Sequence, residues 1–281
     1  MTLRTITSQT YPIIRSWTET ARLRTHQRDG VTLAYTQSGS GKPPLVFLHG
    51  WAGDHTTFTP QIDHFSQTHR TIAVDLRGHG QSDKPEQSYT VAGFADDIAW
   101  LCSHLGVTKP VIVGHSMGGN IALELAARYP ELPAAIILLD TVVFPLPGLK
   151  ENVLLPVEAT LHGPAYREGI RQAIEGLFLP TDDQACKARL MECAATTPQH
   201  VALSTFQNHL INYDASEFAA ACRVPVAYIA ATNPMADLAR FRSLCPQLVT
   251  SQVMQAGHFA PLVASDQINA VIDRFLAIKV A

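Results

Sequence analysis

Short runs of apolar residues recur along the chain and alternate with stretches that have helical spacing of their hydrophobic positions. Each run is continuous, without polar alternation, and rich in β-branched residues, which predicts a strand covered on both faces. Helical spacing is clearest at Val91, Phe94, Ile98, Leu101 and Leu105. The buried strands predicted in this way are 45–48, 71–74, 111–113, 134–139 and 224–230, and residues 247–253 are expected to form the last strand. Strands that alternate with helices predict an α/β fold with a doubly wound, mostly parallel sheet.

The N-terminal part of the chain has a different pattern. Two runs of alternating residues, from Leu23 onward, flank Arg28-Asp29-Gly30, and the Asp-Gly pair predicts a hairpin turn. Residues 1–22 are rich in Thr and Ser and lack the apolar core of a signal peptide. Arginines with few acids faintly suggest an organellar transit segment, but we interpret these residues as an N-terminal arm on the domain.

The alternation of strands and helices breaks between residues 142 and 213. This stretch contains no clear strand, six prolines and two strongly helix-like segments, at 166–177 and 183–195. It follows directly on the strand that ends beside Asp140. We therefore expect a helical insertion at 142–213 in a core formed by residues 23–141 and 214–281.

Composition excludes several functions. Charged residues make up 16% of the 281 residues, against a typical ~25%, which suits a large buried core. A net charge of -3 gives no basic surface for nucleic acid, and no apolar run approaches the ~20 residues of a membrane span. The five cysteines are scattered, which predicts reduced thiols in a cytoplasmic protein without disulfides. The twelve histidines form no metal-binding spacing.

One motif carries specific chemistry. The strand at 111–113 ends in Gly114-His115-Ser116-Met117-Gly118, and a helix is predicted directly after it. A Gly-x-Ser-x-Gly turn between strand and helix is sharp enough to require both glycines, and it exposes the serine hydroxyl at the carboxyl edge of the sheet. Ser116 is therefore the candidate nucleophile.

This motif, with three others, resembles the α/β-hydrolase family. The others are His-Gly-Trp at 49–51, Asp-Leu-Arg-Gly-His-Gly-Gln-Ser-Asp at 75–83 and Gly-His-Phe at 257–259. The resemblance runs from about residue 23 to the C-terminus and implies an eight-stranded sheet. It also implies that residues 142–213 are a helical cap over the active site. The alternative is a peripheral helical subdomain without substrate contacts.

The resemblance further implies the roles of individual residues. Ser116 would be the nucleophile, and His258, in the loop between the last strand and the last helix, would be its base. The backbone amides of Met117 and Trp51 would form the oxyanion hole. His49, His79 and Arg77 are interpreted as structural residues.

The catalytic acid is where this sequence departs from the family. The family places Asp or Glu just after the strand that here ends at Ala230, but this chain has Asn233 there. An amide cannot stabilise the imidazolium that forms during catalysis. Asp140 and Asp237 are the candidate replacements. We favour Asp140, which ends the strand after the nucleophile helix; the alternative is that Asp140 is only a structural carboxylate.

The sequence thus predicts a serine hydrolase that cleaves a small ester, lactone or related acyl compound through an acyl-enzyme, without a metal or organic cofactor. Two alternatives remain: a cofactor-free oxygenase with a His/Asp dyad, and a weakly catalytic ligand receptor, which Asn233 favours. The expected partner is a small-molecule substrate, with neither nucleic acid nor a membrane. The sequence is also compatible with a homodimer.

Overall fold

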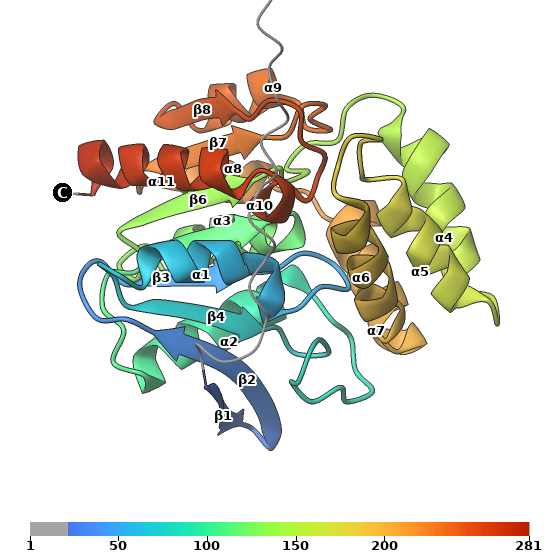
Figure 1. Cartoon of the computed structure of the whole chain (residues 1–281), viewed down its shortest axis with the longest axis horizontal. Helices are drawn as coiled ribbons and strands as arrows, with labels where there is room; N and C mark the ends of the chain where they lie inside the picture. The colour runs from blue at the N-terminus through green and yellow to red at the C-terminus, as the bar shows by residue number, and fades with distance from the viewer. Residues whose placement is uncertain (1–21, 281) are drawn as a thin grey trace, which may run out of the picture.

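Eight strands form one sheet in the computed structural model, which describes residues 22–280 (Figure 1). Their order is β1-β2-β4-β3-β5-β6-β7-β8; β1 and β2 are antiparallel to their neighbours and all other pairs are parallel. The strands are β1 (Leu23–Arg28), β2 (Val31–Ser38), β3 (Leu45–Leu48), β4 (Thr71–Asp75), β5 (Val111–His115), β6 (Ala135–Leu139), β7 (Val226–Ala230) and β8 (Leu248–Gln252). The predicted eight-stranded, mostly parallel sheet is confirmed. The predicted N-terminal arm, apart from Arg22, lies outside the described residues.

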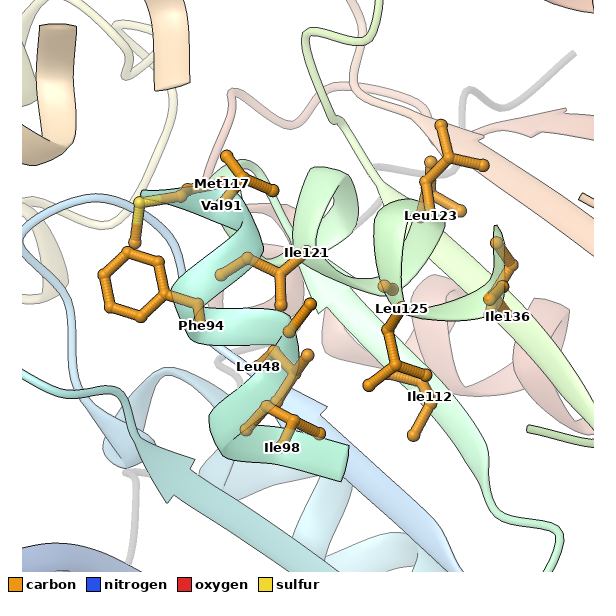
Figure 2. Close-up of a cluster of buried hydrophobic side chains, with 14 of the residues drawn as sticks. Leu48, Val91, Phe94, Ile98, Ile112, Met117, Ile121, Leu123, Leu125 and Ile136 are labelled. Atoms are coloured by element: carbon orange, nitrogen blue, oxygen red, sulfur yellow. The ribbon is translucent and has the colours of Figure 1, made fainter. Parts of the chain in front are cut away.

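Helices cover both faces of this sheet, which explains why its central strands are continuously apolar. On one face are α2 (Val91–His104), α3 (Met117–Arg128), α8 (Ser216–Ala221) and α9 (Leu238–Leu244); on the other are α1 (Thr59–Phe65) and α11 (Ser265–Lys279). Figure 2 shows Leu48 beside Ile98 of α2 and Ile121 of α3, and Ile112 beside Leu125 of α3. Their strand neighbours Phe47 and Val113 belong to the core on the opposite face.

Several helix boundaries differ from the prediction. The sequence predicts one helix from Asp54 to about residue 65, but the structure has a short 3-10 helix, η1 (His55–Phe58), followed by α1. The hydrophobic spacing at 262–278 likewise predicts one helix, but the structure has two, α10 (Ala260–Val263) and α11, because the backbone leaves the helical region at Ala264. Helix α8 was not predicted. None of the helices in residues 22–280 is long and apolar enough to cross a membrane.

Residues between β6 and β7 form helices beside one end of the sheet (Figure 1). These elements are η2 (Lys150–Leu154), α4 (Leu155–Leu161), α5 (Tyr166–Glu175), α6 (Gln184–Ala195), α7 (Gln199–Phe206) and η3 (Gln207–Ile211), and we call them the cap. They share a hydrophobic core that also includes Trp51, Ala52 and Phe259 from the sheet domain. The cap is therefore packed directly on the loops that follow β3 and β8.

Candidate active site

Ser116 lies in the turn between β5 and α3. Its backbone has φ of 53° and ψ of -117°, a strained conformation for a residue with a side chain. The turn is possible because its two glycines leave room: a Cβ at Gly114 would collide with the backbone of Gly118, and one at Gly118 would collide with the carbonyl group of Leu48. The elbow predicted from the motif is thus present, with Ser116 at the carboxyl end of β5.

His258 and Asp140, which are 118 positions apart in sequence, form a buried hydrogen-bonded pair. The distance from His258 Nδ1 to Asp140 Oδ2 is 2.7 Å, and Asp140 Oδ1 accepts from the backbone N–H of Ala231 at 3.0 Å. Burial alone would raise the pKa of Asp140, but the hydrogen bond and charge of His258 outweigh it and hold that pKa below its ordinary value. The carboxylate is therefore ionised beside the imidazole.

The other two candidates for the acid position have different surroundings. Asp237 caps the N-terminus of α9, where its side chain accepts from the N–H of Arg240 at 2.9 Å. The sequence pattern predicts Asp237 inside this helix, but the structure places it at the N-cap, directly before the first residue. Asn233 has an exposed side chain. Of the three, Asp140 is the residue whose side chain contacts His258.

The two amides expected in the oxyanion hole belong to segments next to Ser116. Met117 is the first residue of α3, so its N–H has no acceptor within the helix. The loop with Trp51 runs close to the serine, because a Cβ at Gly50 would lie 3.0 Å from the Cβ of Ser116. This loop is also strained, with φ of 55° at Ala52. The positions are compatible with two donors aimed at one oxygen.

The indole of Trp51 joins the sheet domain to the cap. Its Nε1 donates to the carbonyl oxygen of Ala202, in α7, at 2.9 Å. Its ring packs edge-on against Phe206, with centroids 5.2 Å apart, and also lines the cavity above Ser116. The sequence left the role of this indole open; the structure shows that it both packs on the cap and walls the cavity.

Two further histidines near the serine hold backbone groups. His49 bonds the carbonyl oxygen of Gly50 at 2.8 Å and accepts from the N–H of Leu76 at 3.0 Å, which ties the loops after β3 and β4 together. His115 Nε2 lies 2.8 Å from the carbonyl oxygen of His258. Burial lowers the pKa of His115 to about 3, so its ring is neutral at ordinary pH and Nε2 is the donor.

Arg77 and Asp75 also have structural contacts. Arg77 forms an ion pair with the buried Asp97 at 2.6 Å, as predicted. Asp75 accepts hydrogen bonds from the backbone N–H groups of His55 and Gln81, which fixes the loop after β4. Neither residue lines the cavity at Ser116.

The cap segment 177–182 holds the loop of His258, which the sequence did not predict. The N–H of His258 donates to the carbonyl oxygen of Leu177 at 3.0 Å. The N–H of Gly257 donates to the buried carboxylate of Asp182 at 3.2 Å, and Phe178 stacks on Phe259 with centroids 4.8 Å apart. A Cβ at Gly257 would meet Asp182 and the backbone of Leu177, which explains the glycine.

A cavity of about 350 Å³ lies between the cap and the sheet domain, within the ~300–1,000 Å³ common for small-molecule sites. Ser116 and His258 form part of its floor, and the cap supplies most of its walls. The remaining lining residues are Gly50, Trp51, Ala52, Gly53, Thr57, His115, Val142, Leu149, Val153, Leu154, Val157, Gln172, Ala173, Ile174, Gly176, Leu177, Leu190, Ala194, Phe206, Leu210, Met235 and Phe259. Within residues 22–280, no group of three or more His, Cys, Asp or Glu side chains is arranged to hold a metal.

A serine elbow and a His–Asp pair at the carboxyl edge of a parallel sheet, under a helical cap, define a site of the α/β-hydrolase type. Residues 43–173 match the family model described as alpha/beta hydrolase fold. The chain has a TM-score of 0.81 with the enol-lactonase from Burkholderia xenovorans LB400, covering 90% of this chain and 100% of that one at 20% identity. The chain thus has the α/β-hydrolase fold, and somewhat less than half of its length matches the family model.

Curated relatives match over shorter segments. The 2-(acetamidomethylene)succinate hydrolase of Mesorhizobium japonicum is 41% identical over 110 residues, which is 39% of each protein. Epoxide hydrolase 4 of Mus musculus is 34% identical over 135 residues, or 47% of this chain and 37% of that one. The matched segments thus span about two fifths of the length of these relatives.

Proposed function

We propose that this protein is a serine hydrolase that cleaves a small ester, lactone or related acyl compound through an acyl-enzyme. The observation that carries the proposal is the 2.7 Å hydrogen bond between His258 and Asp140, in a cavity floored by Ser116. Asn233, which is not an acid, occupies the family's usual position of the catalytic acid. In this proposal Asp140, a buried and ionised carboxylate, takes that role. The names of the relatives, which include hydrolases and an enol-lactonase, support the same class of reaction.

The arrangement supports the following steps. Asp140 accepts a hydrogen bond from the Nδ1–H of His258, which keeps the proton on Nδ1 and leaves Nε2 as the basic nitrogen. Nε2 takes the hydroxyl proton as Ser116 attacks the carbonyl carbon, and the amides of Met117 and Trp51 stabilise the resulting oxyanion. The tetrahedral intermediate collapses, and the departing alkoxide takes the proton from His258. Water, deprotonated by His258, then attacks the acyl-enzyme; the second tetrahedral intermediate collapses to the acid, and the departing oxygen of Ser116 takes the proton back from His258.

The test is a panel of uncharged esters and lactones assayed with the wild type and with Ser116→Ala. We expect hydrolysis by the wild type and a loss of at least ~10³-fold in kcat for the variant, because the nucleophile is absent. A fluorophosphonate probe should label the wild type at Ser116. Hydrolysis at wild-type rates by folded Ser116→Ala would contradict the proposal. Oxygen uptake with hydroxyquinolones, without ester turnover, would instead favour the His/Asp oxygenase.

A further inference from the structure

Within the part of the chain that the structure describes, residues 22–280, no charged Lys, Arg, Asp or Glu side chain lines the cavity above Ser116. Its polar residues, apart from Ser116, are Thr57, Gln172, His115 and His258. Since burial keeps His115 neutral, it offers no positive charge to a substrate. The rest of the lining is glycine or apolar, and it contains no Lys, Arg, Asp or Glu.

This lining discriminates strongly between substrates. A carboxylate that enters such a cavity loses its hydration and finds no cation to replace it, and burying an unpaired charge is very costly. An aliphatic group that enters gains the favourable transfer from water. The cavity therefore selects against acidic substrates before any chemistry takes place.

The cavity opens to solvent along η2. Val153 lines the cavity, yet 46% of its surface is exposed, so it lies at the mouth. Leu146 and Leu155, on either side of it in sequence, are also exposed, by 42% and 41%. Gln172 and Gly176 of the α5 region line the cavity and are exposed as well. Val153 is thus an apolar residue that both lines the cavity and reaches the outside of the cap.

We propose that the substrate is an uncharged ester or lactone with an aliphatic arm that runs from Ser116 toward Val153. This inference rests on the proposed serine hydrolase, and it names the substrate class of that site. Acidic substrates, in which a carboxylate lies a few carbons from the reacting carbonyl, are excluded by the same lining.

The first experiment compares ethyl butanoate with monoethyl succinate, which have the same number of acyl carbons and differ by a terminal carboxylate. We expect kcat/KM to be at least ~100-fold higher for ethyl butanoate, because the carboxylate would be buried without a partner. Acid release is followed in a pH-stat, with Ser116→Ala as the blank. Equal or faster turnover of monoethyl succinate would overturn the proposal.

The second experiment tests the mouth of the cavity with two matched surface substitutions. Val153→Asp should lower the ratio of kcat/KM for ethyl octanoate to that for ethyl acetate by ~10-fold. Val249→Asp, on β8, replaces a valine that is 38% exposed and does not line the cavity, so both rates should stay at wild-type values. A ratio unchanged in Val153→Asp would show that the arm does not take this route.

A binding measurement separates this inference from the proposed function. Ser116→Ala, which has no nucleophile, is titrated by calorimetry with ethyl octanoate and with monoethyl succinate. If the wild type hydrolyses no ester but the variant binds only ethyl octanoate, the hydrolase proposal fails and the ligand class holds. If esters are hydrolysed through Ser116 but both compounds bind equally, the ligand class alone fails.

Discussion

The carboxylate of Asp182, in the cap, accepts a hydrogen bond from the backbone N–H of Gly257, the residue directly before His258, at 3.2 Å. The same carboxylate accepts from the N–H of Leu179 at 2.7 Å. One buried side chain therefore connects the turn between α5 and α6 with the loop of the proposed catalytic base. The position of His258 depends on the cap as well as on the sheet.

Removing this carboxylate should slow catalysis more than it weakens substrate binding. Asp182→Ala leaves the N–H of Gly257 without its acceptor, and a displacement of the base by about 1 Å costs on the order of 10²-fold in rate. We expect kcat to fall by ~10–100-fold with KM changed less than ~3-fold. Asp182→Asn, which keeps one acceptor oxygen, should restore part of the loss.

Asp183 provides a matched control in the next position of the chain. Its side chain caps α6 by accepting from the N–H of Cys186 at 2.7 Å. Asp183→Ala should therefore lower the free energy of unfolding by about 1 kcal/mol and leave kcat unchanged. If both variants lose the same fraction of kcat, Asp182 acts through the stability of the cap rather than through His258.

Asp140→Asn should lower kcat by roughly 10³–10⁴-fold, because an amide neither holds the required tautomer of His258 nor stabilises its cationic form. The measurement is kcat/KM on the best ester of the panel. Placing a carboxylate at the family's usual position, in the double variant Asp140→Asn with Asn233→Asp, should recover part of this activity.

Asp237→Asn is the control for this prediction, since Asp237 caps α9 and an asparagine caps a helix about as well. Its activity should remain within a few-fold of the wild type. A large loss of kcat/KM in Asp237→Asn, with little loss in Asp140→Asn, would show that Asp140 has only a structural role.

Sequence patterns were sufficient for the sheet and much weaker for the helices. Continuous apolar runs identify strands such as 111–113 because both faces of the sheet are covered, so every side chain is buried. The short helix α8 has no such pattern, and the break at Ala264 between α10 and α11 reflects local backbone geometry rather than hydrophobic periodicity. The π-helical segments η2 and η3 were missed for the same reason.

The residues of the candidate site also differ in how well the sequence predicts them. Ser116 and His258 lie in short motifs whose spacing is fixed by local turns, so the sequence identifies them. The contact of His258 with Asp140 depends on how β6 and the loop after β8 meet, and the sequence left Asp237 as an alternative. Asp182 carried no signal at all, because its partner Gly257 is 75 positions away.

A buried histidine in the cap predicts how stability changes with pH. His209 is 3% exposed, neither of its ring nitrogens has a hydrogen-bond partner within the described residues, and burial lowers its pKa to about 3. The folded state thus holds it neutral, whereas the unfolded chain binds a proton below about pH 6.5. This group therefore reduces the stability of the wild type as the pH falls from 6.5 toward 3.

His209→Leu removes this penalty. We expect the variant to gain stability over the wild type as the pH falls. The difference in free energy of unfolding, variant minus wild type, should be about 2 kcal/mol larger at pH 5 than at pH 8. Urea unfolding at the two pH values measures the difference. A difference that is the same at both values would show that His209 titrates alike in the folded and unfolded chains.

The central claim is that Ser116 is acylated during turnover. The most direct measurement is mass spectrometry of the protein quenched in acid while it hydrolyses ethyl butanoate, followed by peptide mapping. We expect a mass increase of one butanoyl group on the peptide that contains Ser116, and no such adduct in Ser116→Ala. An adduct on another residue, or undiminished hydrolysis by Ser116→Ala, would contradict it.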